Sequence, residues 1–218
     1  MKQFFYKLGI LIAMKRTSHI VPIVLFVIYC ALFTILAFNP IDRPTWWVEN
    51  ATVWIIVGVI AVLYWRGVQF SNTAYVFMAI LVYLHTIGGH YTFANVPFDL
   101  VTNFFGFERN HYDRVAHFTV GFYAFPIAEW ILAKRVTTSR FVLLTYPICV
   151  LMAIAASYEL IEWIYAISTN PEAGAAYLGS QGDIWDAQKD MLADTLGAFF
   201  ATIFFFIQRE KDINRLRK

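Results

Sequence analysis

Long runs of apolar residues, separated by short polar segments, dominate the chain. A helix needs about 20 apolar residues to cross the hydrocarbon core of a bilayer. Six runs of about this length are present, at residues 20–38, 46–65, 73–91, 115–133, 141–167 and 187–208. We therefore predict an all-α fold, a polytopic membrane helix bundle with about six transmembrane helices.

The two ends of the chain differ from this central bundle. In residues 1–16 the apolar side chains share one helical face and the lysines lie opposite, which predicts a short helix on the membrane surface. Residues 209–218 are basic and predict a cytoplasmic tail. Because no internal repeat is visible, residues 1–218 are expected to form a single integral membrane domain, with residues 20–208 as the transmembrane bundle.

Composition supports the membrane prediction. The chain is 59% hydrophobic and 15% charged, whereas soluble domains are about 45–50% apolar and about 25% charged. The net charge of +2 gives no reason to expect a nucleic-acid partner, so the lipid bilayer is the expected partner. Cys30 and Cys149 both fall inside apolar runs, which favours buried thiols over a disulfide or a metal pair. The oligomeric state cannot be read from the sequence.

Basic residues are distributed unevenly between the loops. If the N-terminus is cytoplasmic, thirteen of the 17 basic residues fall in segments on the inner side. Loops rich in Lys and Arg stay in the cytoplasm. We therefore predict that both termini face the cytoplasm.

This orientation brings histidines and acids from four spans to the outer end of the bundle. The third span ends with two histidines, the fourth begins with a histidine–acid motif, the fifth ends with two glutamates, and the sixth begins with aspartates. In chain order these residues are His85, His90, His111, Asp113, His117, Glu159, Glu162, Asp183, Asp186, Asp190 and Asp194.

The segment "GDIWDAQKDMLADTLG", residues 182–197, places Asp186, Asp190 and Asp194 at intervals of four residues. This spacing makes one acidic stripe along a helix. A charged side chain at the bilayer centre costs about 2.5–3.5 kcal/mol on insertion scales. Asp190 and Asp194 therefore need partners, which could be protonated histidines, basic residues (Arg109, Arg114 or Lys189) or a bound cation.

Each motif also has a purely structural explanation. In "HYDRVAHF", Asp113 and His117 lie at i and i+4, so a simple hydrogen bond could explain the pair. In "YELIEW", Glu159 and Glu162 share one face at i and i+3, and one of them could be a neutral acid bonded to a neighbouring helix. "HTIGGHY" could exist for Gly88 and Gly89, which allow helices to approach closely.

Taken together, the motifs favour a shared functional site, because ionisable residues inside membranes usually serve function. Carboxylates with imidazole suit Zn or Mn, and carboxylates alone suit Mg. We predict a divalent metal ion with Asp186, Asp190, Asp194 and His117 as first-choice ligands and Asp113, His111, His85 and His90 as further candidates. Glu159 or Glu162 is the candidate general base, and Arg114 the candidate contact for an anionic head group.

The ordered set "HTIGGHYTF…VPF", "HYDRVAHFTVGF", "YELIEW" and "GDIWDAQKDMLADTLGA" resembles the YjdF-like bacterial inner-membrane family. The similarity covers roughly residues 20–208. It implies a multi-pass protein of the bacterial inner membrane whose biochemical role is not established. Asp113 with His117, the glutamates of the fifth span and "DMLADTLGA" also resemble, more remotely, VanZ-like membrane proteins, and that likeness transfers no catalytic role.

Two functions of different classes, and a third possibility, follow from these observations. The first is a metal-dependent membrane enzyme acting at the periplasmic face on an envelope lipid or a lipid-linked phosphate. The second is a proton- or cation-coupled transporter that uses the same residues as a relay. Only Glu129 could carry such a path inward, and no inverted repeat supports it. A non-catalytic accessory protein is the third.

Overall fold

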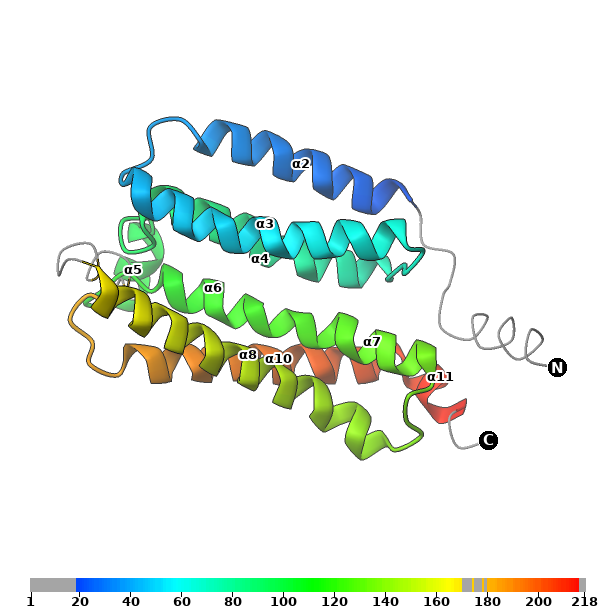
Figure 1. Cartoon of the computed structure of the whole chain (residues 1–218). Helices are drawn as coiled ribbons and strands as arrows, with labels where there is room; N and C mark the ends of the chain where they lie inside the picture. Colours follow the sequence, from blue (N-terminus) through cyan, green and yellow to red (C-terminus); the bar gives the residue numbers. More distant parts are fainter. Residues whose placement is uncertain (1–18, 170–173, 175–177, 179, 216–218) are drawn as a thin grey trace.

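The computed structural model describes residues 19–169, 174, 178 and 180–215. This part of the chain is helical and contains no strand, as predicted (Figure 1). The surface helix predicted at residues 1–16 lies outside the described residues.

The long helices follow the predicted spans closely. They are α2 (Ile20–Leu36), α3 (Arg43–Trp65), α4 (Asn72–Tyr91), α8 (Arg140–Ser168) and α10 (Asp186–Gln208). The fourth span is divided into α6 (Tyr112–Val120), a 3₁₀ turn η1 (Gly121–Tyr123) and α7 (Ala124–Lys134). Two short helices, α5 (Asp99–Phe105) and α11 (Glu210–Asn214), complete the described chain.

The membrane helix bundle is confirmed. Five continuous helical stretches are long and apolar enough to cross a membrane, with the α6–α7 stretch counted as one. The remaining helix, α2, has 17 residues, which is the lower end of the range for a spanning helix. The cytoplasmic placement of the termini stays a prediction.

The helices run up and down between two chemically different ends (Figure 1). We call the end where α3, α6 and α10 begin and α4 and α8 finish the acidic end, because it holds the aspartate stripe. The opposite end, where α2 begins and α10 finishes, is the basic end. α4 contacts α2, α3 and α6, and α10 contacts α6, α7 and α8, so α4 and α6 join the two halves of the bundle.

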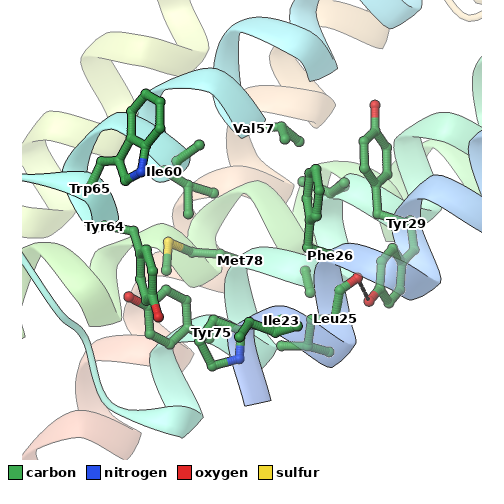
Figure 2. Close-up of a pocket in the computed structure, with 15 residues that line it drawn as sticks. Ile23, Leu25, Phe26, Tyr29, Val57, Ile60, Tyr64, Trp65, Tyr75 and Met78 are labelled. Carbon is green, nitrogen blue, oxygen red and sulfur yellow. Dashed lines mark hydrogen bonds between the residues drawn. The ribbon is translucent and has the colours of Figure 1, made fainter. Parts of the chain in front are cut away.

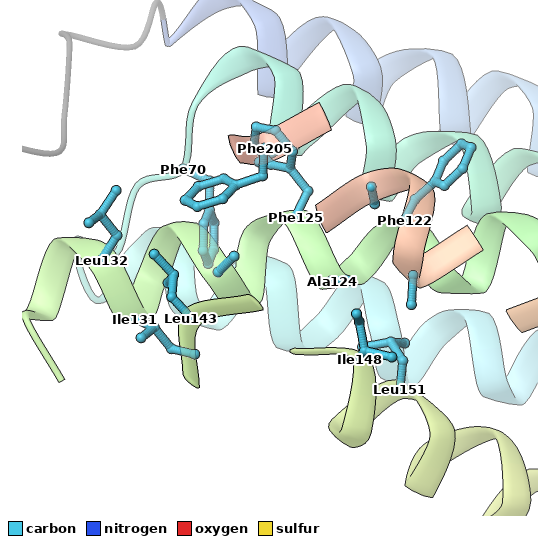
Figure 3. Packing of buried hydrophobic residues seen from close by; sticks show 14 of the residues in the cluster. Phe70, Phe122, Ala124, Phe125, Ile131, Leu132, Leu143, Ile148, Leu151 and Phe205 are labelled. Carbon is cyan, nitrogen blue, oxygen red and sulfur yellow. The ribbon is translucent and has the colours of Figure 1, made fainter. Parts of the chain in front are cut away.

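A core of aromatic and aliphatic side chains fills the bundle from its middle to its basic end (Figure 3). Phe125, Phe205 and Leu143 are completely buried there, and Phe122 and Leu151 pack in the same cluster. This apolar layer lies between the polar groups at the two ends.

Helix starts in the loops are fixed by short polar side chains. The Asp42 carboxylate accepts a hydrogen bond from the Thr45 amide at 2.7 Å, and the Ser71 hydroxyl accepts one from the Ala74 amide at 3.3 Å. Such N-caps satisfy amides that have no partner inside the helix. They set where α3 and α4 begin, and therefore which of their residues reach the acidic end.

Two glycines let α6 and α10 touch through their backbones. A Cβ on Gly197 would stand 1.8 Å from the carbonyl oxygen of Phe118, and a Cβ on Gly121 would stand 2.1 Å from the amide nitrogen of Ala198. No larger residue fits at either position without separating the helices. The contact lies one turn from His117 and Asp194 and brings the two side chains together.

The outer surface of the bundle is apolar, as a lipid-facing surface must be; Trp65 is 91% exposed. Cys30 and Cys149 carry free thiols, but both are exposed on this surface. The prediction that they are buried was therefore wrong, because in a membrane protein an apolar run is as often turned toward lipid as toward the core.

The larger apolar cavity lies between α2, α3 and α4, toward the basic end (Figure 2). Its volume is about 380 Å³, and Phe26, Tyr29, Val57, Ile60 and Met78 are among its walls. No acid, histidine, lysine or arginine is found among its described lining residues. The candidate chemistry therefore has to be sought at the other end.

Candidate functional site

His117 occupies the centre of the polar cluster at the acidic end. Its Nδ1 lies 3.2 Å from Asp194 Oδ1, and its Nε2 lies 3.6 Å from Asp190 Oδ1 and 3.7 Å from Asp113 Oδ1. Asp190 and Asp194 are 4% and 1% exposed. The first three turns of α10 thus deliver two buried carboxylates to one imidazole of α6.

Three of these residues have the arrangement of a cation site. Asp113, His117 and Asp190 each offer one ligand atom, and these atoms lie within 4.8 Å of one another. Two carboxylate oxygens and one imidazole nitrogen form a donor set found around Zn and Mn. The i, i+4 spacing of Asp113 and His117 on α6 supplies two of the three ligands from one helical face.

The rim of the cluster consists of ion pairs. The Arg114 guanidinium donates to both Asp186 and Asp190. Arg109 Nη1 lies 2.9 Å from Asp186 Oδ1 and 3.3 Å from Asp183 Oδ2. Lys189 Nζ lies 2.7 Å from Asp183 Oδ2, and this hydrogen bond lowers the pKa of the Asp183 carboxyl. The sequence left arginine pairing open as an alternative to a bound cation. Arginines therefore neutralise the Asp186 carboxylate and part of the negative charge of the Asp190 carboxylate.

Below this rim lies a cavity of about 120 Å³ between α3, α4, α6, α8 and α10. It is large enough for several water molecules or ions. Besides the hydroxyls of Thr52 and Tyr158, its polar walls are four carboxylates and two imidazoles, with no lysine or arginine among the described lining residues. These six residues are Glu49, Asp113, Glu162 and Asp194, with His85 and His117.

Glu49 of α3 was not predicted as a site residue from the sequence. It is 3% exposed, and its Oε2 lies 3.0 Å from His85 Nε2. Gly89 makes room for it, since a Cβ there would stand 2.9 Å from the Glu49 Cβ, which confirms that this glycine serves close helix approach. An acid within the apolar run 46–65 was the signal that could have identified it.

The remaining candidates have different surroundings. Glu159 is not among the described lining residues of the cavity, although its Oε1 is buried without a hydrogen-bond partner in the described chain. His90 Nδ1 lies 2.8 Å from the carbonyl oxygen of Leu36. His111 occupies the N-cap position of α6 without a side-chain hydrogen bond to the helix, and its ring packs edge-on against Phe107. The structure does not bring His90 and His111 into the cluster around His117.

His111 lies just outside the spanning segments, at the mouth of the cluster. Partial burial lowers the pKa of its imidazole, and the positive charges of Arg109, Arg114 and Lys189 lower it further. Its imidazole is therefore held in the neutral form more strongly than an ordinary histidine.

A second polar network closes the basic end. Glu129 of α7 is 5% exposed and accepts hydrogen bonds from the Arg209 guanidinium and from Ser71, whose amide and hydroxyl lie 3.0 and 3.1 Å from Glu129 Oε2. These contacts join α7 to the start of α4 and the end of α10. The buried Phe122 and Phe125 belong to the apolar layer between this network and the cavity.

Comparison with known proteins identifies relatives by sequence. A family described as "Predicted membrane protein (DUF2238)" matches residues 21–211. The chain is 34% identical over 197 residues to the inner membrane protein YjdF of Escherichia coli (strain K12), a match that covers 86% of this chain and 91% of the relative. No solved structure matches.

Proposed function

Because the chain belongs to the DUF2238 family of predicted membrane proteins and is a multi-pass inner-membrane protein, we propose that its acidic end is the active site of a cation-dependent enzyme. The substrate would be an envelope lipid or a lipid-linked phosphate at the periplasmic face. The observation that carries the proposal is the Asp113–His117–Asp190 group, whose ligand atoms lie within 4.8 Å of one another beside a cavity.

The charge balance around the cavity favours a bound cation. Four carboxylates and two imidazoles line it, so with every carboxylate ionised even two protonated imidazoles leave a net negative charge. Buried charges of one sign are costly unless they are neutralised. A divalent cation on Asp113 and Asp190 supplies the missing positive charge. The mixed oxygen and nitrogen donors suit Zn or Mn better than Mg, which prefers oxygen ligands.

Such a cation would neutralise phosphate oxygens or activate water. Among the two glutamates of α8, Glu162 lines the cavity, so it is the better placed general base. Arg114 has its guanidinium bonded to Asp186 and Asp190 and therefore holds these two carboxylates in place. Arg109 is therefore a better candidate than Arg114 for contact with an anionic head group. Its Nε and Nη2 are buried without hydrogen-bond partners among the described residues.

The basic end supports an enzyme over a transporter. A transported proton or cation would need polar groups across the whole bundle. Glu129 is instead bonded to Arg209 and Ser71, and the buried aromatic layer separates it from the cavity. The buried aromatic layer therefore favours a site that a substrate reaches from the acidic end, as chemistry on a lipid head group requires.

The test uses the purified full chain in detergent. It is stripped with a chelator, reloaded with Mn²⁺ or Zn²⁺, assayed for bound metal, and incubated with bacterial envelope lipids. Phosphorus NMR should reveal new phosphate species with the wild type. Asp190→Asn should lack both metal and product, and Asp99→Asn, an exposed aspartate of α5, should retain both. A wild-type protein that keeps no metal would overturn the proposal.

A further inference from the structure

We infer that the apolar cavity between α2, α3 and α4 binds one acyl chain of an anionic phospholipid, whose head group lies at the basic end (Figure 2). This lipid site is separate from the acidic end and does not depend on the catalysis proposed there. Its volume of about 380 Å³ falls within the range of about 300–1,000 Å³ that is usual for ligand sites.

The cavity exists because α2 and α3 both pack on α4 but scarcely on each other. The two helices meet only toward their ends. On the acidic side the Phe33 ring of α2 packs against Trp46 of α3, with ring centroids 5.5 Å apart. At the basic end His19 Nδ1 lies 2.8 Å from the Tyr64 hydroxyl oxygen. The cavity occupies the stretch between these two contacts.

This cavity opens sideways onto the lipid-facing surface of the bundle. Ile23 and Phe26 of α2 line it from one side, and Ala61 and Trp65 of α3 from the other. All four residues are exposed, so the cavity is continuous with the surface that lipid covers. An acyl chain that enters gains close contacts with the walls and leaves only other acyl chains behind, so its entry carries no cost of removing apolar surface from water.

The walls suit a hydrocarbon chain. The described lining carries no charged side chain. The hydroxyls of two of its tyrosines already have partners in the protein: Tyr83 donates to the carbonyl oxygen of Leu25 at 2.8 Å, and Tyr75 accepts from the Phe70 amide at 3.4 Å. The surface left for a ligand therefore consists mainly of aromatic rings and aliphatic side chains.

The length of the cavity matches one leaflet of a bilayer. Its lining runs from Val57 to Trp65 on α3 and from Tyr75 to Tyr83 on α4. Each stretch rises by about 12 Å, at about 1.5 Å per residue. One leaflet contributes half of a hydrocarbon core of about 30 Å. Because the buried cluster around Val53 closes the cavity toward the acidic end, the chain has to come from the leaflet at the basic end.

Basic side chains stand where the head group of that lipid would lie. Arg66 directly follows Trp65 at the end of α3 and is exposed. His19, which is also exposed, is held beside the cavity by its contact with Tyr64. Exposed tryptophan is typical of the level of the head groups, and arginine there pairs with phosphate oxygens. Basic groups between helix ends select anionic lipids, so the expected ligand is an anionic phospholipid.

Native mass spectrometry of the full chain tests the site. Delipidated protein in detergent is titrated with phosphatidylglycerol or phosphatidylcholine that carry the same acyl chains. The wild type should retain one phosphatidylglycerol more tightly than any other lipid. Ala61→Phe places a ring in the cavity, and the exclusion of only two methylene groups weakens binding by more than about tenfold. Ala51→Phe, at an exposed position of α3 outside the cavity, is the matched control and should bind as the wild type.

The head group is tested by a second pair of variants. Arg66→Gln should reduce the preference for phosphatidylglycerol over phosphatidylcholine. Lys134→Gln, at an exposed lysine of α7 at the basic end, should leave that preference unchanged. Melting temperatures without lipid show whether each variant is folded. Added phosphatidylglycerol should raise the melting temperature of the wild type and of Ala51→Phe, but not that of Ala61→Phe.

Three results would overturn the inference, whether or not the acidic end binds a metal. The first is a wild type that retains no lipid or holds both lipids equally. The second is a folded Ala61→Phe variant that keeps the lipid as tightly as the wild type. The third is a wild-type dimer that Ala61→Phe disrupts, because a second copy of the chain would then occupy the cavity. If Ala61→Phe fails to fold, the wild-type titration decides alone.

Discussion

The α-carbon of Gly197 in α10 rests against the carbonyl oxygen of Phe118 in α6, so closely that an added Cβ would stand 1.8 Å from that oxygen. His117 precedes the contact by one residue and Asp194 by three. The distance between the imidazole and the carboxylates of the candidate centre is therefore set by a backbone contact in which no side chain takes part.

Gly197→Ala should consequently destabilise the protein, because α6 and α10 must separate to admit the methyl group. Overpacking of this kind costs about 1–3 kcal/mol. Gly58→Ala is the matched control, since nothing lies within 4 Å of a Cβ at that helical glycine. Thermal unfolding in detergent measures both. A Gly197→Ala protein that melts with the wild type would show that the helices separate without cost.

Asp190→Asn and Asp194→Asn should strip a bound metal and lower the melting temperature of the metal-loaded protein. The apo forms should lose less stability than the metal-loaded forms, because only the pairing with Arg114 or His117 is removed there and no metal is lost. Asp183→Asn, at the rim, should have a small effect. Melting curves with and without a chelator give the comparison. If the chelator leaves the wild type unchanged while Asp190→Asn still destabilises it, Arg114 and His117 alone neutralise the acids.

Arg114→Gln should be strongly destabilising, because it leaves Asp190 buried without its arginine and Asp186 paired with Arg109 alone. Breaking one side of a buried ion pair costs about 3–5 kcal/mol. Arg215→Gln, at a side chain 63% exposed, serves as the control and should cost little. Denaturant unfolding of Arg114→Gln, Asp190→Asn and the double variant tests the pairing. Purely additive losses would mean that the two residues do not interact.

His111 should titrate below the ordinary histidine pKa of about 6.5. The folded protein favours the neutral imidazole, so as the pH falls below about 6.5 the unfolded chain takes up a proton that the folded chain refuses, and stability decreases. Histidine-labelled NMR, assigned with His111→Gln, gives the midpoint. Arg109→Gln should raise it only in part, since burial is the larger cause. A midpoint at or above the ordinary value would contradict this account.

Both termini should lie in the cytoplasm, which places the acidic end at the periplasmic face. Alkaline phosphatase fused after Lys218 should therefore be inactive in cells, and a fluorescent protein fused at the same residue should be bright. Phosphatase activity from that fusion would reverse the orientation, and with it the face on which a lipid substrate is expected.

The helices could be predicted from the sequence because the thickness of the bilayer determines the length of each apolar run. The predicted runs 73–91 and 141–167 became Asn72–Tyr91 and Arg140–Ser168. The break at η1 was not predicted, although Pro126 signals it, because a proline cannot donate the helical hydrogen bond to the carbonyl of Phe122 four residues earlier.

The site was readable only in part. The order and direction of the spans place residues at a predictable level in the membrane. This was enough to predict that Asp113, His117, Asp190 and Asp194 lie close together. Depth does not determine which way a helix face turns. His90 therefore lies against the carbonyl oxygen of Leu36 and not in the cluster. His85 and Glu49, which the sequence analysis did not identify, both line the cavity.

The pairing of α10 with α6 bears on how the protein is made. Alone, the first turns of α10 would carry Asp190 and Asp194 into lipid at a cost of about 2.5–3.5 kcal/mol for each charge. Their partners Arg114 and His117 lie 76 and 77 residues earlier in the chain. When the last span leaves the ribosome, the fourth is thus already in the membrane to receive it. The order of synthesis therefore favours insertion of α10, because the partners of its buried carboxylates already lie in the membrane when it emerges.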